Sequence, residues 1–235
     1  MSHPMAILHA EMPRQGPGCA DDVAWAVRQA QLSGAVRIID AGCGPGADLE
    51  TFADLLPDAQ LSGIDAMPHL VQEAQIRLGT RAQITQGDMA QLTGPVDLIW
   101  CAGAIYFLGV TKALGTWRAA LAPGAFIAFS EPVLPDDPSE IADMFWAEYS
   151  AITDGAGLTA RIEAAGFSTF AQRDIVGAPW GGYYAALERR VEMLSTKADP
   201  ALADVLSAAK REIELWSRAP DQIIYRLSLV RVMTG

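Results

Sequence analysis

One short run constrains the fold of this chain more than any other feature: V-R-I-I-D-A-G-C-G-P-G-A-D-L, at residues 36–49. Its apolar, β-branched start predicts a buried strand at 36–40, and Gly42, Gly44 and Gly46 follow before a helix-length segment. Glycines allow a tight turn and let the backbone approach a ligand closely. The helix that follows offers free backbone N–H groups and a partial positive charge. The run therefore predicts a strand–loop–helix unit that binds a nucleotide-like ligand.

Strand and helix patterns alternate along the rest of the chain. Apolar runs predict strands at 36–40, 60–65, 82–86, 96–100 and 125–130, and the segments between them predict helices at 21–32, 47–56, 68–78 and 111–121. Such alternation is typical of a parallel sheet covered by helices on both faces. The expected fold class is α/β: a Rossmann-like, doubly wound, mostly parallel sheet.

The pattern changes after residue 130. Asp137-Pro138-Ser139-Glu140 resembles a capping box that opens a helix to about residue 149. Helices at 157–165, 181–195 and 200–218 and strands at 167–176 and 222–233 complete the chain. We expect one domain over 1–235, with helical cover elements at about 1–33, 132–150 and 179–218. These covers either close an acceptor pocket with their Trp and Tyr residues or form a second hydrophobic cluster.

Composition excludes several classes of function. The formal charge of −11 disfavours nucleic acid and anionic membrane surfaces as partners. Three cysteines without CxxC spacing indicate neither a disulfide framework nor a zinc knuckle, and no motif indicates another metal. The chain shows no signal-peptide layout and no membrane-length apolar run. We therefore expect a cytoplasmic protein that acts on a small molecule and uses no metal.

Three acidic residues follow predicted strands. Asp40 precedes the glycines, where a carboxylate is a poor neighbour for pyrophosphate but suits an ammonium or sulfonium group. Asp65 ends the second strand and can accept hydrogen bonds from ribose hydroxyls, although it can also cap the next helix. Asp88 can accept an adenine amino group or can serve a turn after Gly87. The alternative is a dinucleotide site, because Gly42, Gly44 and Ala47 also fit its spacing.

Together with L-A-P-G-A-F-I-A-F-S-E at 121–131, the glycine loop and these carboxylates resemble the class I S-adenosylmethionine (SAM)-dependent methyltransferases. The segments at 14–18, 97–109 and 179–184 are similar to a bacterial branch of small-molecule methyltransferases grouped loosely with quinone-biosynthesis enzymes. The resemblance implies a seven-stranded sheet with an antiparallel last strand and SAM as cofactor. The implied cofactor-binding residues are Arg14, Asp40, Gly42, Gly44, Gly46, Asp65, Ala66, Met67, Asp88, Met89, Trp100, Cys101 and Ala102.

Acceptor-site residues are less constrained, because methyl transfer from a sulfonium mainly requires in-line positioning and exclusion of water. The candidates are His9, Arg14, Tyr106, Trp146, Trp180, Tyr183 and Tyr184. Among them His9, Tyr106 and Tyr183 are the candidate catalytic residues. Adjacent tyrosines do not share a helix face, so at most one of Tyr183 and Tyr184 is expected to face the pocket.

Three functions remain open at this point. The favoured one is transfer of the SAM methyl group to a small molecule with release of S-adenosylhomocysteine (SAH). The second is a SAM- or SAH-binding protein without transferase activity, because Ala102 and Phe107 replace an acidic residue and an asparagine common in the resembling branch. The third is an NAD(P)-dependent oxidoreductase that uses the same glycine loop.

Overall fold

A computed structural model describes residues 4–196 and 198–233 and contains a seven-stranded sheet in the order β3-β2-β1-β4-β5-β7-β6. The strands are β1 (Arg37–Ala41), β2 (Gln60–Asp65), β3 (Ala82–Gln86), β4 (Val96–Cys101), β5 (Leu121–Val133), β6 (Phe167–Ile175) and β7 (Ile224–Val232). The neighbouring strands from β3 to β5 pair in parallel, and β7 is antiparallel to β5 and β6. This topology confirms the predicted fold class.

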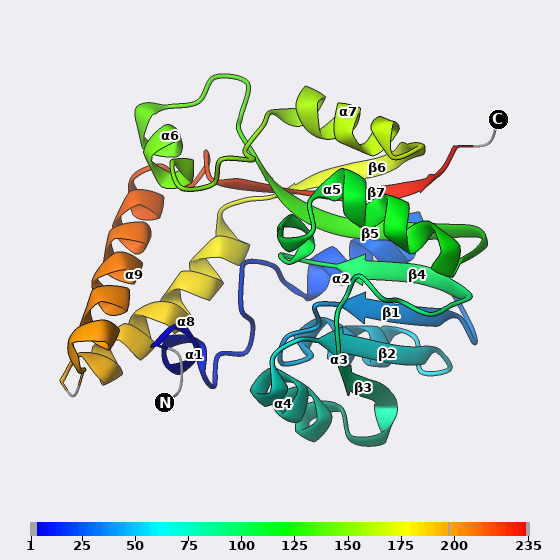
Figure 1. The fold of residues 1–235 in the computed structure, drawn as a ribbon, viewed down its shortest axis with the longest axis horizontal. Coiled ribbons are helices and arrows are strands. Elements are labelled where there is room, and N and C mark those ends of the chain that lie inside the picture. Colours follow the sequence, from blue (N-terminus) through cyan, green and yellow to red (C-terminus); the bar gives the residue numbers. More distant parts are fainter. Residues whose placement is uncertain (1–3, 197, 234–235) are drawn as a thin grey trace.

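Helices cover both faces of this sheet and the carboxyl ends of its parallel strands (Figure 1). Their bounds are α1 (Pro4–His9), α2 (Ala20–Gln29), α3 (Ala47–Leu55), α4 (Pro68–Leu78), α5 (Val110–Trp117), α6 (Glu140–Trp146), α7 (Gly155–Ala164), α8 (Ala178–Ser195) and α9 (Pro200–Arg218). Single 3-10 turns lie at Gly79–Arg81, Ile105–Phe107 and Arg118–Ala120. Among the described residues, no helix combines the length and apolarity needed to cross a bilayer.

The core divides into two clusters because side chains alternate across each strand. Ile38 and Leu98 pack in one cluster with residues of α2, α3 and α4. Their neighbours Ile39 and Ile99 pack in the other with residues of α5 and α7. The helices thus lie on both faces of the sheet, as the hydrophobic pattern predicts.

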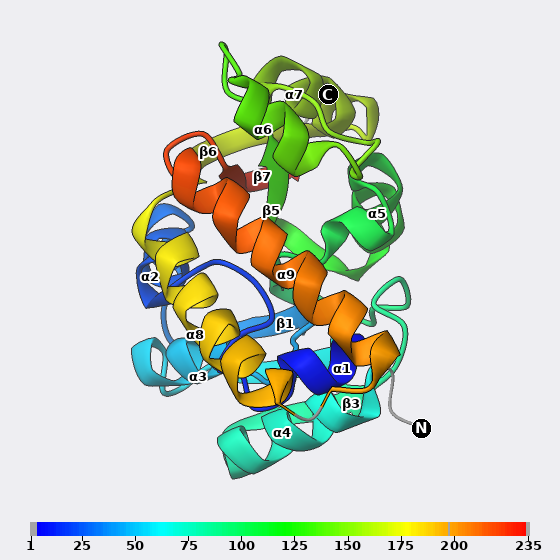
Figure 2. The ribbon, with the colours of Figure 1, turned by 90° about the vertical axis from the view of Figure 1, so that its left-hand side faces the viewer.

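Four helices form a cover beside the carboxyl ends of the parallel strands. Helix α9 packs against α8, α6 and α1, and Figure 2 shows α9 crossing in front of that edge of the sheet. Arg190 on α8 donates hydrogen bonds to the carbonyls of Ile7 and Leu8, at 2.8 and 3.2 Å, which satisfies the end of α1. The segments predicted as cover elements supply these helices, apart from residues 1–3 and 197, which lie outside the described residues.

Most predicted boundaries agree with the structure within a few residues, but the predicted capping box is misplaced. Ser139, not Asp137, caps α6, since its side chain accepts a hydrogen bond from the amide of Ala142. Ser139 has the extended backbone geometry of an N-cap, with φ of −75° and ψ of 159°, so the helix begins at Glu140. The helix predicted at 111–121 also ends early, because β5 begins at Leu121.

Candidate functional site

The glycine loop joins β1 to α3 and is fixed by backbone hydrogen bonds to the end of β2. The amides of Gly42 and Cys43 both donate to the carbonyl of Ile64, at 2.8 and 3.1 Å. Gly42, Gly44 and Gly46 have φ values of 80°, 52° and 84°, in the left-handed region that favours glycine. Because β1 lies between β2 and β4, the loop opens at the point where strand order reverses, the usual ligand crevice of open α/β sheets.

Asp65 connects this loop to the second strand. Its Oδ2 accepts a hydrogen bond from the amide of Gly44, and its Oδ1 accepts one from the amide of Met67, both at 2.9 Å. A carboxylate has about four acceptor positions, so lone pairs remain for a ligand. Asp65 therefore both orders the loop and presents acceptors at the carboxyl end of β2.

Asp40 is buried at the end of β1. Burial raises the pKa of the Asp40 carboxyl well above its usual range, and the nearby carboxylates of Asp48 and Asp65 raise it further, whereas Arg14 lowers it. A positively charged ligand group at this position would stabilise the ionised carboxylate. The site is thus suited to a cation.

The raised pKa of Asp40 predicts a pH-dependent stability. Between the ordinary carboxyl pKa and the raised folded value, unfolding releases the proton, so the free energy of unfolding falls as pH rises. Each pH unit in that window costs at most about 1.4 kcal/mol. We expect the melting temperature of Asp40→Asn to fall less than that of wild type between about pH 5 and pH 8. Equal slopes, with exposed Asp58→Asn as the matched control, would contradict this assignment.

An ion pair holds the N-terminal segment over α3. Arg14 donates to Asp48 Oδ1, and the indole Nε1 of Trp100 donates to Asp48 Oδ2 at 2.9 Å. Gln15 donates through its side chain to the carbonyl of His9 at 3.1 Å. These contacts place residues 14–17 along one wall of the cavity above the glycine loop.

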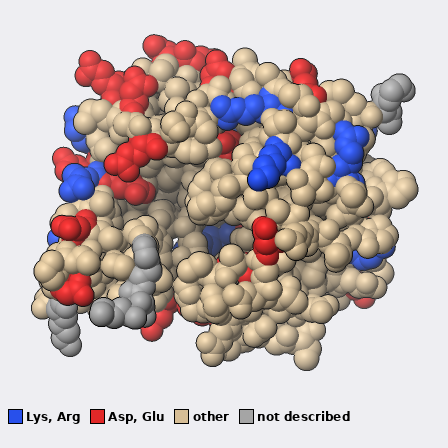
Figure 3. Space-filling model, viewed as in Figure 1, with Lys and Arg blue, Asp and Glu red and all other residues tan. Residues whose placement is uncertain are grey.

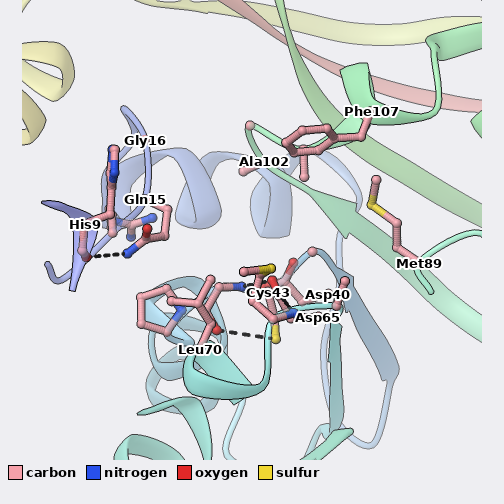
Figure 4. A pocket seen from close by; sticks show the side chains of 18 of the residues that line it. His9, Gln15, Gly16, Asp40, Cys43, Asp65, Leu70, Met89, Ala102 and Phe107 are labelled. Atoms are coloured by element: carbon pink, nitrogen blue, oxygen red, sulfur yellow. Dashed lines mark hydrogen bonds between the residues drawn. The ribbon is translucent and has the colours of Figure 1, made fainter. Parts of the chain in front are cut away.

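A cavity of about 770 Å³ lies above the glycine loop. Figure 4 shows Asp40 and Asp65 at its base, with His9 and Gln15 on one side and Met89 on the other. The predicted site residues that line it are His9, Arg14, Asp40, Gly42, Gly44, Asp65, Ala66, Met67, Asp88, Met89, Ala102 and Tyr106. The structure therefore brings most of the predicted set together around one space.

Three predicted cofactor residues do not line this cavity. Trp100 and Cys101 are fully buried in the sheet core, since both lie within β4 and not beyond its end. Trp100 acts on the site through its hydrogen bond to Asp48. Gly46 is the residue before α3, where its Cβ would lie 3.1 Å from Ala74, so it permits close packing of α3 on α4.

Asp88 forms the predicted turn and also borders the cavity. Its Oδ1 accepts a hydrogen bond from the amide of Ala90 at 2.8 Å, which is turn chemistry, and the residue also borders the cavity. The adjacent Met89 is held through its carbonyl, which accepts a hydrogen bond from Trp117 Nε1 at 2.7 Å. The turn therefore positions both residues at the cavity wall.

A second cavity of about 270 Å³ adjoins the first and lies between the cover helices and the sheet edge. Its aromatic lining residues are Tyr106, Phe145, Trp146, Trp180, Tyr183 and Tyr225. Tyr184, by contrast, is buried and stacks near Trp180, as expected for one of two adjacent tyrosines. Of the candidate acceptor residues, His9, Tyr106, Trp146, Trp180 and Tyr183 line this space.

His9 is held in one tautomer. Its Nδ1 donates to the carbonyl of Met5 at 3.0 Å, and its Nε2 lies 3.2 Å from the Tyr183 hydroxyl. Burial lowers the pKa of His9, so the ring is neutral near pH 7 and Nε2 accepts from the hydroxyl. A group that enters the second cavity therefore meets a neutral imidazole paired with a phenol.

Sequence reasoning missed several lining residues. Asp48 and His69 border the first cavity, and Glu212 borders the second. Glu212 lies on one face of α9, where lining residues recur at 205, 208, 209 and 212. That spacing of i, i+3, i+4 and i+7 was a usable signal for a helix face that meets a cavity.

Comparison with known proteins finds a methyltransferase domain in part of the chain. Residues 38–124 match the methyltransferase domain family. A trans-aconitate 2-methyltransferase of Paracidovorax citrulli is 33% identical over 142 residues, which cover 56% of this chain and 54% of that protein. Another from Methylobacterium nodulans is 33% identical, over 46% of this chain and 43% of that protein. The chain thus spans about half the length of these curated relatives.

Solved structures share the whole fold. A SAM-dependent methyltransferase from Thiobacillus denitrificans, crystallised with SAH, has a TM-score of 0.85 at 19% identity and covers 99% of each chain. The Escherichia coli protein YjhP has a TM-score of 0.85 at 21% identity, over 99% of this chain and 100% of its own. The sheet order and the crevice define a Rossmann-like methyltransferase fold. Residues 38–124 thus match a methyltransferase domain, and the chain as a whole shares its fold with solved SAM-dependent methyltransferases.

Proposed function

We propose that this protein transfers the methyl group of SAM to a small-molecule acceptor and releases SAH. The observation that carries the proposal is the cavity at the strand-order reversal, which has a buried carboxylate on each side of a glycine loop. The 33% identical relatives are named for methyl transfer, and the Thiobacillus denitrificans structure contains SAH.

The residues present fit SAM. Asp65 presents free carboxylate lone pairs that suit two ribose hydroxyls, and Asp40 suits the cationic methionine end. Asp88, Met89, Ala66 and Met67 border the part of the cavity that would hold the adenine. A methyl at Gly42 would lie 2.7 Å from Ala104 Cβ, so the loop leaves no room for a side chain there.

SAM supplies an already activated methyl group when it is bound. An acceptor lone pair forms a bond to the methyl carbon while the carbon–sulfur bond breaks, and that electron pair stays on sulfur. A proton lost by the acceptor passes to a base or to water. The chain itself has to align the acceptor and exclude water, and the cover helices with residues 14–17 supply the walls for both. His9 Nε2 is a neutral base that already accepts from the Tyr183 hydroxyl.

The two alternatives make different predictions. A SAM- or SAH-binding protein without activity would bind both cofactors and give no product, and the apolar Ala102 and Phe107 at the cavity wall motivate that alternative. An NAD(P)-dependent oxidoreductase would bind NADH at the glycine loop instead. Asp40 disfavours it, because a pyrophosphate beside the loop would oppose ionisation of this buried carboxyl group, whereas a cationic ligand group would favour it.

Turnover tests the proposal directly. The protein is incubated with SAM carrying a labelled methyl group and with pools of small amines, alcohols, phenols and carboxylic acids. We expect SAH and one labelled product to form together, and neither to form with Asp65→Ala. SAM binding without SAH release from any pool would favour the binding-protein alternative.

A further inference from the structure

The two cavities adjoin each other and have part of their walls in common. They share seven lining residues: Met5, His9, Gln15, Gly16, Pro17, Gly103 and Tyr106. Gly103 and Tyr106 follow β4 directly and stand between the glycine loop and the cover helices. The second cavity is therefore placed to hold an acceptor beside the methyl donor.

The wall of the second cavity is mainly aromatic and carries one acidic side chain. Six aromatic side chains line it, and Glu212 is its one carboxylate among the described residues. The described lining residues include neither Lys nor Arg, and His9 is neutral. Aromatic faces carry negative charge density and attract cations, as a carboxylate does. The lining thus presents only groups that favour a neutral or cationic occupant.

Glu212 is held in place at the border of this cavity. Its Oε1 accepts a hydrogen bond from the Tyr184 hydroxyl at 2.8 Å. Burial of the carboxyl group raises the pKa of Glu212, and the nearby Glu148 raises it further. Glu212 is an exposed residue of α9, and its carboxyl group lies at the border of the cavity. A cation beside it would lower that pKa and restore the charge.

One segment beside this cavity has the same sign. Residues 134–149 contain five acidic residues and no Lys or Arg, and this segment supplies Phe145 and Trp146 to the wall. Figure 3 shows acidic side chains gathered over α6, beside the hollow between the cover helices and the sheet. Such a field attracts cations and repels anions.

We propose that the acceptor is a small amine that binds as its ammonium form among the aromatic rings and Glu212 of the second cavity. It loses a proton to a base or to water, and the nitrogen lone pair then forms the bond to the methyl carbon as the carbon–sulfur bond breaks. This inference rests on the proposed methyl transfer. It also separates this chain from the named activity of its relatives, because trans-aconitate would bring three carboxylates to a wall that offers them no cation.

Three probes of one shape test the charge preference: benzylamine, benzyl alcohol and benzoate. Each is titrated by calorimetry into protein saturated with SAH, and trans-aconitate is titrated in parallel. We expect benzylamine to bind at least about tenfold more tightly than benzoate or trans-aconitate. Glu212→Gln should reduce benzylamine affinity about tenfold and leave benzyl alcohol unchanged. Glu214→Gln, an exposed neighbour on the same helix, is the matched control.

The outcomes separate the two proposals. Absence of SAH binding by the wild-type protein would overturn the proposed function itself. SAH binding with a preference for benzoate or trans-aconitate, or with no charge preference, would overturn only the amine assignment. Equal losses for benzylamine and benzyl alcohol in Glu212→Gln would show that Glu212 shapes the cavity and does not bind a cation.

Discussion

Replacing Asp65 by alanine is expected to lower the affinity for SAM and SAH about 100-fold or more. A hydrogen bond to a charged group contributes about 1.5–3 kcal/mol, and two ribose hydroxyls would lose theirs. Each 1.4 kcal/mol corresponds to about tenfold in affinity. The change also removes the acceptor for the amides of Gly44 and Met67, so the glycine loop loses its side-chain hydrogen bond to the end of β2. Isothermal titration with each ligand measures the effect.

Controls distinguish binding from folding at this position. Asp65→Asn keeps one acceptor oxygen, so its affinity should fall between those of wild type and Asp65→Ala. Asp58→Ala removes an exposed carboxylate just before the same strand and should leave affinity unchanged. Circular dichroism establishes that each variant is folded. If folded Asp65→Ala binds SAH as tightly as the wild-type protein does, Asp65 is not part of the cofactor site.

Gly42→Ala is expected to cost about 2–5 kcal/mol of unfolding free energy and to reduce SAH affinity at least about tenfold. A non-glycine residue with a φ of 80° is strained by about 1–2 kcal/mol. The new methyl would also lie 2.7 Å from Ala104 Cβ, and such overpacking costs about 1–3 kcal/mol more. To relieve the clash, either the glycine loop or the segment that carries Ala104 after β4 must move. Urea denaturation and SAH titration measure the two effects.

Gly124→Ala provides the matched comparison. Gly124 has a φ of 79°, yet no other group lies within 4 Å of the position that an alanine methyl would take there. It sits near the start of β5, away from the cavity. This variant should show the backbone strain alone, with normal SAH affinity. If both variants bind SAH equally well, the close approach at Gly42 has no role in binding.

The sheet could be predicted from sequence because its strands are continuous apolar runs separated by clear breaks. Parallel strands buried on both faces give such runs, as in β4, where every residue except Asp97 is a buried apolar side chain. The carboxylates of Asp40 and Asp65 were predictable for the same reason, because they end strands whose ends were clear. The resemblance to methyltransferases added the seventh strand's direction.

The cover and its cavity were less predictable because tertiary contacts define them. Helix α1 has six residues and depends for its terminal hydrogen bonds on Arg190, which lies far away in the sequence. The resemblance to methyltransferases implied that Trp100 lines the cofactor site, whereas the sheet core encloses it. The spacing of residues 205, 208, 209 and 212 indicates one helix face, but the cavity that this face and Glu212 meet is defined only by where α9 packs.

A thermal-shift comparison of SAM, SAH and NADH tests the central claim most directly. Saturation at about 100 times Kd should stabilise the fold by about 2.7 kcal/mol, which raises the melting temperature of a chain this size by about 5–11 °C. We predict that shift with SAM and with SAH, and none with NADH. A shift with NADH alone would contradict the assignment of this cavity to SAM.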